Sequence, residues 1–327
     1  MTGPARPTRV AAVVVSYNRG PLLAETLEAL AAQTHRPAAV VVVDNASTDG
    51  SAEVAERDGV DLVRLEVNTG GAGGFATAMA TALARHDPTW IWVMDDDVVP
   101  APGALAALLA AADASATPVD ALCSRAEWTD GREHPMNTPR PWALASRTAR
   151  ENASAAGGVA VRSVSFVSSI YRVSAVRERG LPIADYFIWN DDFEYSTRII
   201  AGSLGLAVPA SVVLHQTAAL ADTDADPGPR FYFEVRNKLW VFRHARGLLP
   251  REKAVFVLST ARRWIRTWRR SQDRAVIADG WRRGVGDARS RPPRPNAVVL
   301  AGAGVPPDVL DVVAELDRVQ QAWEHGR

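Results

Sequence analysis

The stretch WIWVMDDDVVP (residues 90–100) decides the fold class of this chain, because it joins an unbroken apolar run to three consecutive acids. A run such as residues 90–94 fits a strand that is buried on both faces, which is typical of a parallel sheet. Asp95, Asp96 and Asp97 repel one another, so they cost free energy unless a solvated turn or a bound cation offsets their charge. Carboxylates suit hard cations such as Mg²⁺ or Mn²⁺. We interpret the triplet as a metal site at the end of a buried strand.

Three further apolar runs of the same kind precede this stretch, and a helical pattern follows each of the four. Strands are predicted at 10–15, 39–44, 61–67 and 90–95, and helices at roughly 21–35, 51–58, 76–86 and 102–114. Strands that alternate with helices in this way predict an α/β fold, in which a mostly parallel sheet carries helices on both faces.

The pattern is looser after about residue 115. Loops or antiparallel strands are expected over 117–165, strands at 163–173 and 205–215, and a helix at 189–203. A polar linker at 222–230 then leads into a helical, basic region that runs to about residue 283, with a further helix near 307–325.

Composition places the chain among globular proteins. It has 327 residues, 47% hydrophobic and 23% charged, so disorder is not its dominant state. Cys123 is the single cysteine, which excludes an internal disulfide and fits a reducing compartment. The first ten residues lack an apolar core of signal-peptide length, and no apolar run reaches the ~18 residues of a membrane span. We therefore expect a cytoplasmic protein, with membrane contact only as a peripheral protein on the inner face of the plasma membrane.

Charge is unevenly spread, although the formal net charge is zero. Residues 261–283 hold eight arginines against two aspartates, a local excess of six positive charges. Trp264 and Trp268 lie four residues apart within this segment, on one face of a helix. Such a helix either packs its tryptophans in a core or lies on an anionic membrane surface, and the segment favours the membrane. The acidic remainder of the chain argues against nucleic acid as a partner.

Each unusual loop of the N-terminal half follows a predicted strand. These loops are SYNRG (16–20), DNASTDG (44–50), NTGGAGG (68–74) and the acidic triplet. In open α/β sheets, ligands bind at the carboxyl ends of the strands, so the loops are expected to share one site. A dinucleotide-binding domain fits poorly, because its glycine motif follows the first strand, whereas the glycine cluster here follows the third.

Two of these loops have both a structural and a functional interpretation. Gly70, Gly71, Gly73 and Gly74 allow left-handed backbone, and they also let a backbone approach a ligand closely. Asp44 ends the second strand, where it either initiates a turn or accepts a hydrogen bond from a nucleotide base.

The same holds for polar residues farther along the chain. Asp191, Asp192 and Glu194 open a predicted helix, where acids favour the macrodipole and where one of them could act as a general base. His215 ends an apolar strand and is either structural or a metal ligand.

Together these motifs resemble the inverting glycosyltransferases of family 2, which have the GT-A fold. The resemblance covers about residues 9–240 and rests on VVVSYNR, VVVDNASTDGS, NTGGAGGF, the acidic triplet and NDDFE, in that order. A later segment, FYFEVRNKLWVFR (231–243), resembles the aromatic-Arg-Asn segment of bacterial members. Within the family, the motifs are most similar to those of actinobacterial galactofuranosyltransferases and bacterial rhamnosyltransferases.

The resemblance implies a role for each motif. Asp95 and Asp97 would hold Mn²⁺ or Mg²⁺, with His215 as a further ligand, and Asp192 would be the base, with Asp191 as the alternative. Asp44 would bind a uracil or thymine ring, and Asp96 would lie against the nucleotide sugar. The remaining donor-binding residues would be Ser16, Tyr17, Asn18, Arg19, Asn68, Gly70, Gly71, Gly73 and Gly74.

The resemblance also implies an organisation and a reaction. A GT-A catalytic domain would span 1–227, with a nucleotide-binding part at about 9–115 and an acceptor and base part at about 116–227. A basic, mainly helical region would span 228–327. The enzyme would transfer galactofuranose or rhamnose from a UDP- or dTDP-sugar to a glycan or a polyprenyl-diphosphate-linked acceptor, in cell-wall or polysaccharide biosynthesis, and it could form an oligomer.

Two other classes of function were weighed. A nucleotidyltransferase acting on sugar phosphates would also use acids and a metal, but SYNRG lacks the glycine-rich loop that such enzymes carry after the first strand. A non-catalytic nucleotide-sugar-binding module would be expected to lack a member of the acidic set, and none is missing.

Overall fold

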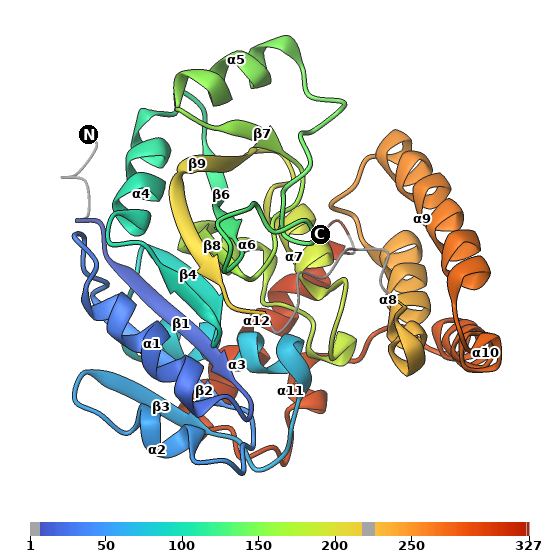
Figure 1. The fold of residues 1–327 in the computed structure, drawn as a ribbon, viewed down its shortest axis with the longest axis horizontal. Helices are drawn as coiled ribbons and strands as arrows, with labels where there is room; N and C mark the ends of the chain where they lie inside the picture. The colour runs from blue at the N-terminus through green and yellow to red at the C-terminus, as the bar shows by residue number, and fades with distance from the viewer. Residues whose placement is uncertain (1–6, 218–225, 325, 327) are drawn as a thin grey trace.

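The computed structural model describes residues 7–217, 226–324 and 326 (Figure 1). Its N-terminal half alternates strands and helices as the sequence predicts. The elements are β1 (Val10–Ser16), α1 (Gly20–Ala31), β2 (Ala39–Asp44), α2 (Ser51–Ala55), β3 (Val60–Arg64), α3 (Gly70–Arg85), β4 (Trp90–Asp95), β5 (Val98–Pro100) and α4 (Ala104–Ala114).

The middle of the chain adds strands and short helices to this half. They are β6 (Val119–Glu127), α5 (Arg147–Ala155), β7 (Val159–Val161), β8 (Ser168–Arg172), α6 (Val173–Arg179), the 3₁₀ turn η1 (Ala184–Tyr186), α7 (Asp191–Ile199) and β9 (Leu204–His215). The strand predicted at 163–173 is shorter, because residues 163–167 form a loop in front of β8.

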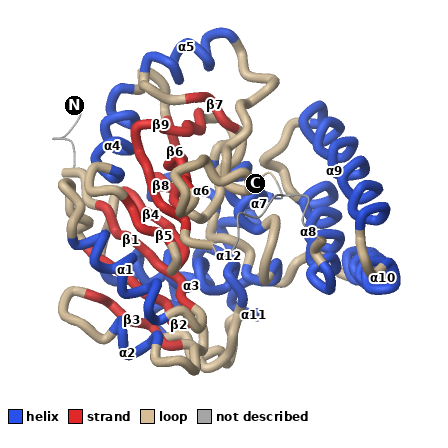
Figure 2. Tube along the Cα trace, viewed as in Figure 1, coloured by secondary structure: helices blue, strands red, loops and turns tan. Residues whose placement is uncertain are grey.

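All of these strands belong to one sheet, in the order β3-β2-β1-β4-β8-β6-β9-β5, with β7 paired to β9 (Figure 2). The strands β3, β2, β1 and β4 are parallel to their neighbours, as predicted. The pairs β4–β8, β6–β8, β5–β9 and β7–β9 are antiparallel, and β6–β9 is parallel, so the sheet as a whole is mixed. The parallel part positions the loops after β1, β2 and β4 at one edge.

Helices cover both faces of the sheet because successive strand residues point to opposite sides. Val10, Ala12 and Val14 pack towards α1, α2 and α4. Ala11 and Val13 pack towards α3, α6, α7 and the C-terminal helix α12 (Pro307–Glu324). Strands buried on both faces explain why β1 is an unbroken apolar run.

The C-terminal third is helical, as predicted. It consists of η2 (Gly228–Arg230), α8 (Phe231–His244), α9 (Pro250–Arg270), α10 (Arg274–Ser290), α11 (Asn296–Val299) and α12. Residues 222–225 of the predicted linker lie outside the described residues, and residues 228–230 of it form η2. The predicted domain boundary at residue 227 stays a prediction. Helix α12, which follows that boundary in the chain, packs on α3 and α6 of the N-terminal part.

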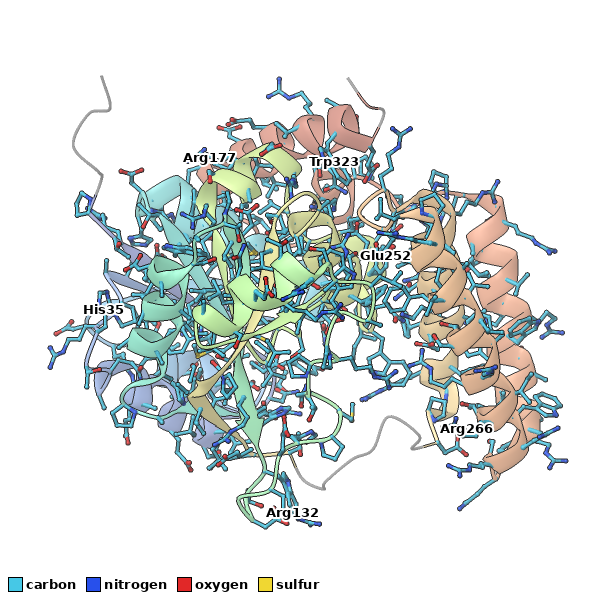
Figure 3. All side chains as sticks on the ribbon, turned by 90° about the horizontal axis from the view of Figure 1, so that it is seen from above. His35, Arg132, Arg177, Glu252, Arg266 and Trp323 are labelled. Carbon is cyan, nitrogen blue, oxygen red and sulfur yellow. The ribbon has the colours of Figure 1, made fainter. Side chains whose placement is uncertain are left out.

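Helices α9 and α10 stand at the side of the molecule (Figure 1). Seen from above, Arg266 of α9 and His35 after α1 lie on opposite sides, while Glu252 lies where α9 meets the sheet domain (Figure 3). Glu252 is buried there and accepts hydrogen bonds from Trp142 Nε1 (2.8 Å) and Arg162 Nε (3.2 Å). In the described part of the chain, no helix is both long and apolar enough to cross a membrane.

Candidate active site

The candidate site lies where the order of the parallel strands reverses. Strand β1 lies between β2 and β4. Strand β3, which follows β2 in the chain, pairs with β2 on the side away from β1. The loops after β1 and β2 are joined by hydrogen bonds: Asn18 Oδ1 accepts from the Thr48 amide (2.7 Å), and the Arg19 amide donates to Ser51 Oγ (3.0 Å). A crevice at such a reversal is the usual ligand site of an open α/β sheet.

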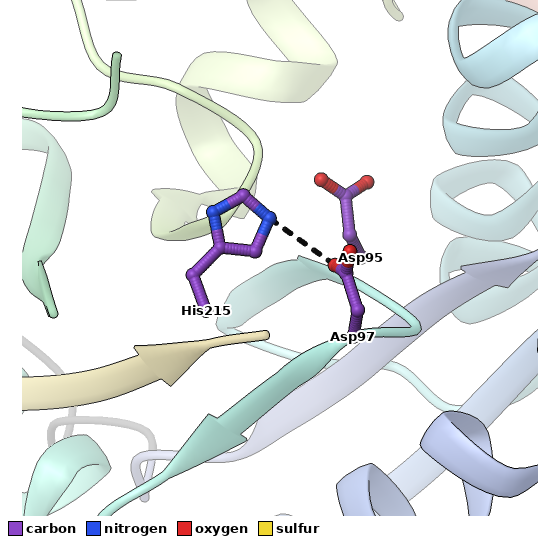
Figure 4. Close-up of side chains that lie close together, drawn as sticks. All are labelled: Asp95, Asp97 and His215. Carbon is purple, nitrogen blue, oxygen red and sulfur yellow. Dashed lines mark ion pairs between the residues drawn. The ribbon is translucent and has the colours of Figure 1, made fainter. Parts of the chain in front are cut away.

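The acidic triplet forms a turn that brings a histidine beside it. Asp95 ends β4, and Asp96 and Asp97 form the two-residue turn into β5. Because β5 pairs with β9, with Val98 opposite His215, the imidazole of His215 lies at the turn. Its Nε2 lies 3.2 Å from Asp97 Oδ1, and the dashed line in Figure 4 marks this ion pair.

The structure therefore brings together the three residues that were predicted to hold a metal, Asp95, Asp97 and His215, which we call the metal set. One ligand atom from each lies within 4.8 Å of the others. Asp97 Oδ1 is buried and faces Nε2 of His215. Two carboxylates and an imidazole at this separation are a suitable donor set for a divalent cation.

The charges of the triplet perturb one another. Burial and the neighbouring Asp97 raise the pKa of Asp95 to about 7. Burial also acts to raise the pKa of Asp97, but His215 and Arg19 outweigh it and hold that pKa below its usual range. Arg19 forms an ion pair with Asp97, so a guanidinium from the loop after β1 compensates part of the negative charge.

Asn137 fixes the orientation of the predicted histidine ligand. His215 Nδ1 lies 2.9 Å from Asn137 Oδ1, and because that oxygen can only accept, Nδ1 carries the proton. Nε2 is the ring nitrogen that faces Asp97. His134 packs 4.9 Å from the His215 ring, between ring centroids, and its own Nε2 lies 3.0 Å from Thr217 Oγ1.

Sequence reasoning did not find Asn137 or His134 as parts of the site. Both lie in the segment HPMN (134–137), which was interpreted only as loop or antiparallel strand. Neither has a spacing relative to the acidic triplet that could reveal the contact.

Asp96 points away from the metal set. Its Oδ2 accepts hydrogen bonds from Ser16 Oγ (2.9 Å) and the Tyr17 amide (3.0 Å), and burial raises its pKa to about 6. Arg19 Nη1 lies 3.4 Å from its other oxygen. Asp96 therefore holds the loop after β1 to the turn after β4, and the contact with a nucleotide sugar stays a prediction.

Asp44 has the free acceptor that a base-binding residue needs. Its Oδ2 accepts from the Ser47 amide (3.2 Å), whereas its Oδ1 is buried without a partner. The next residue, Asn45, joins this strand end to α3: its Oδ1 accepts from the Thr69 amide (2.9 Å) and its Nδ2 donates to the Gly70 carbonyl (3.0 Å). Asn68 Oδ1 accepts from the amide of Gly70, the first residue of this helix (2.8 Å).

The glycine cluster lies inside α3, not before it as the sequence suggested. A Cβ on Gly70 would lie 2.1 Å from the Phe187 carbonyl oxygen, and one on Gly74 would lie 2.5 Å from Val15 Cγ1. A Cβ on Gly73 would collide with Thr69. Gly71 alone meets no such neighbour and lines the cleft described below. Close packing therefore explains why Gly70, Gly73 and Gly74 are glycines. For Gly71, the close approach of a ligand stays the predicted reason.

The predicted acid pair, Asp191 and Asp192, forms the first residues of α7, and the backbone that leads into this helix is strained. Phe187, Trp189 and Asn190 have φ of 64°, 66° and 65°, which is uncommon for residues other than glycine. Asn237 of α8 holds this connection, because its Nδ2 donates to the carbonyls of Tyr186 (3.0 Å), Ile188 (2.9 Å) and Trp189 (2.7 Å).

Arg236 adds to the same support. Its Nη2 donates to the carbonyl oxygens of Asp185 (2.7 Å) and Tyr186 (3.0 Å). The segment FYFEVRNKLWVFR therefore positions the acid pair, a role that sequence resemblance alone did not assign. Backbone strain of this kind persists where the surroundings enforce it, often at functional sites.

The two acids differ in environment. Asp191 is buried, and burial together with Asp192 raises its pKa well above the usual range. Burial also raises the pKa of Asp192, but the Phe193 amide, which donates to Asp192 Oδ1 (2.6 Å), and the Lys238 ammonium oppose that shift. Asp192 is the more exposed of the two. Asp192 is therefore the more accessible of the two carboxylates, and the Phe193 amide and Lys238 favour its ionised form.

A cleft of about 930 Å³ joins the metal set to the acid pair. Of the predicted site residues, those that line it are Gly71, Asp95, Asp191, Asp192 and His215. Asp44 and the loop after β1 are not part of its lining, and lie at the adjoining strand ends. The arrangement can hold a cation and a proton acceptor on two sides of one substrate.

Comparison with known proteins fits this geometry. The family model for glycosyl transferase family 2 matches residues 11–180, which is just over half of the chain. The chain belongs to glycosyl transferase family 2. It is therefore a glycosyltransferase rather than a nucleotidyltransferase or a non-catalytic module, as the order of its motifs predicted.

Relatives within the family transfer two sugars. The galactofuranosyltransferase GlfT1 of Mycobacterium tuberculosis is 31% identical over 256 residues, 71% of this chain and 81% of that protein. GlfT1 of Mycolicibacterium smegmatis is 30% identical over 201 residues, 60% of this chain and 66% of that protein. The N-acetylglucosaminyl-diphospho-decaprenol L-rhamnosyltransferase of M. tuberculosis is 31% identical over 250 residues, 66% of this chain and 78% of that protein.

Solved structures confirm the GT-A fold. S. aureus TarS (residues 1–349) superposes with a TM-score of 0.59 at 18% identity, over 98% of this chain and 92% of that one. The mannosyltransferase PcManGT of Pyrobaculum calidifontis, solved with GDP-Man and Mn²⁺, superposes with a TM-score of 0.55 at 20% identity, over 97% and 87%.

Proposed function

We propose that this glycosyltransferase is inverting and metal-dependent, and that it moves galactofuranose or rhamnose from a UDP- or dTDP-sugar to a polyprenyl-diphosphate-linked or glycan acceptor. The observation that carries the proposal is the single cleft that contains both Asp95 and His215 of the metal set and the acid pair of α7. The named activities of the relatives support the two sugars.

The residues of the metal set fit Mn²⁺ or Mg²⁺. Asp95, Asp97 and His215 would hold the ion, because one ligand atom from each lies within 4.8 Å of the others. A bound cation would neutralise charge on the departing nucleoside diphosphate. Asn137 holds the imidazole with Nε2 free to coordinate, as partners of metal-ligating histidines usually do.

The chain supplies the proton acceptor for the transfer. Asp192 would take the proton of an acceptor hydroxyl as that oxygen attacks the anomeric carbon, and the bond to the diphosphate breaks in the same step. One displacement inverts the anomeric configuration. Asp191, which burial drives towards its protonated form, is the less suitable base.

The nucleotide would be oriented by the ends of β1 and β2. Asp44 Oδ1 offers a buried acceptor for the ring N–H of uracil or thymine, which would satisfy an atom that otherwise lacks a partner. The loop from Ser16 to Arg19 would seat the rest of the nucleotide beside it.

The acceptor would be presented at an anionic membrane surface. Helix α9 exposes Val255, Leu258, Ile265 and Trp268, which recur at helical spacing, and carries arginines among them. Pelleting with vesicles tests this contact: recovery with anionic vesicles should exceed recovery with neutral ones, and equal recovery would contradict it.

The function is tested by incubating the protein with a panel of UDP- and dTDP-sugars, with and without Mn²⁺. Metal-dependent release of UDP or dTDP from one donor, and a product of inverted configuration by NMR, is the expected result. Release that does not respond to metal chelation, or a retained configuration, would contradict the mechanism.

A further inference from the structure

An apolar groove of about 490 Å³ lies between α9 and α10. Apart from Arg269 and two alanines its lining is made of large apolar side chains: Phe231, Trp264, Ile265, Trp268, Ile277 and Trp281. The rings of Trp264 and Trp281 meet edge-on, with centroids 5.1 Å apart. A volume of this size lies within the about 300–1,000 Å³ typical of small-molecule sites.

The groove is continuous with the catalytic cleft. Phe231 and Trp264 line both the groove and the cleft that contains Asp95 and Asp192. Arg230 and Arg263 line the cleft next to these two shared residues, and Arg263 forms an ion pair with Glu234, which also lines the cleft. A ligand that extends from the cleft into the groove would therefore pass from polar walls, across cationic side chains, to an apolar channel.

The outer half of the groove exposes much of its apolar surface. Ile265 is 54% exposed, and Trp268 and Trp281 are each 44% exposed. Large aromatic side chains gathered in a groove and left in water favour an apolar occupant.

We infer that this groove binds the isoprenoid chain of a polyprenyl-diphosphate-linked acceptor, while the diphosphate lies near Arg230 and Arg263 and the terminal sugar reaches the cleft. The inference rests on the proposed function, because it assigns a place to the lipid part of the acceptor. The sequence of surfaces matches that of the ligand: apolar groove for the chain, arginines for the diphosphate, acids and a cation for the reacting sugar.

The test uses calorimetry on the full chain, with UDP and Mn²⁺ present at saturation so that the donor site is occupied. The probes are farnesyl diphosphate, geranyl diphosphate and inorganic diphosphate. Each buried methylene-sized group should add about fourfold in affinity, so farnesyl diphosphate should bind at least ~10-fold tighter than geranyl diphosphate. Equal dissociation constants for the three probes would overturn the assignment of the groove to an isoprenoid chain.

A matched pair of variants locates the binding. Trp268→Glu should weaken farnesyl diphosphate at least ~10-fold, whereas Leu258→Glu should not, because Leu258 lies on the same helix, is 54% exposed and does not line the groove. Equal losses in both variants would overturn the inference. Metal-dependent UDP binding, measured on both, reports whether the donor site is intact, so that failure of the proposed function is seen separately.

Two other occupants give distinct results. If sedimentation shows a dimer that Trp268→Glu dissociates, while farnesyl diphosphate binds both proteins equally, the groove is an interface between two copies. If Trp268→Glu abolishes vesicle binding with unchanged affinity for farnesyl diphosphate, the groove is a membrane contact alone. Either result would overturn the isoprenoid assignment.

Discussion

The strand ends of the sheet and the pair α9–α10 represent two ways of using side chains. At the strand ends, Asp96 and Asn45 each bond to a separate segment of chain, and Asn237 of α8 bonds to the connection that precedes α7, so these segments are tied down. On α9, the residues buried within the described structure are Glu252 and Thr260, and most of its apolar side chains face solvent. The comparison separates a region built for fixed geometry from a region that keeps its apolar surface available to a ligand.

The largest expected effect tests whether the strand ends hold a metal. Asp97→Ala removes a carboxylate of the metal set and the ion-pair partner of Arg19, so metal-dependent nucleotide binding should be abolished. Calorimetry with UDP, with and without Mn²⁺, measures it. Affinity that still rises on adding Mn²⁺ would show that the ion binds elsewhere.

The next effect concerns turnover. Asp192→Asn should keep donor binding and lose ~10²-fold or more in kcat, the usual scale for removal of a general base. Asp191→Asn is the matched control, since it also begins α7. If Asp192→Asn turns over normally and Asp191→Asn does not, the base is Asp191.

A pair of leucines measures the difference in stability between the two regions. Leu105 of α4 is fully buried (0% exposed), whereas Leu258 of α9 is 54% exposed. Leu105→Ala should lower the free energy of unfolding by about 2–5 kcal/mol, and Leu258→Ala should change it by less than about 0.5 kcal/mol. Urea denaturation gives both values, and a large loss in Leu258→Ala would mean that α9 is covered in solution.

Asn137 tests whether orientation of a ligand matters as much as its presence. Asn137→Ala removes the acceptor at His215 Nδ1, and loss of such a partner typically costs 10–100-fold in metal affinity. Titration with Mn²⁺ measures the loss. Asn137→Asp restores an acceptor at that position and should recover affinity, and a failure to recover would assign Asn137 a purely structural role.

The smallest effect is a shift in pH dependence. Burial raises the pKa of Asp192 and the ammonium of Lys238 opposes this, so kcat should fall as the pH drops through that raised pKa and the base becomes protonated. Burial lowers the pKa of Lys238 to about 8, so Lys238 is charged below that pH. Lys238→Met should move the acid limb of kcat to higher pH. An unmoved acid limb would contradict the assignment.

Much of the fold follows from local pattern. The runs at 10–15, 39–44 and 90–95 are apolar on both faces, and they became the adjacent parallel strands β1, β2 and β4. The start of α3 was less predictable, because glycine lowers helix propensity, and the reason for glycine there is the approach of Val15 and Phe187 from distant parts of the chain.

The site was predictable where a motif carries its own chemistry. The acids of the triplet were predicted as a metal site from residue type and position at a strand end, and the family resemblance added His215; the structure brings Asp95, Asp97 and His215 together. Asn137 and Asn237 were not found, because their roles depend on long-range contacts made by single amide side chains. Such contacts leave no periodic signal in one sequence.

The pairing of β5 with β9 sets a limit on exchanging parts between relatives. Val98 lies opposite His215, and side chains of a strand alternate between its two faces. One residue inserted or deleted just before the end of β9 would turn the imidazole to the reverse side and leave the carboxylates without it. Chimeras that swap acceptor specificity should therefore join segments outside Leu204–His215 and preserve the length of that strand.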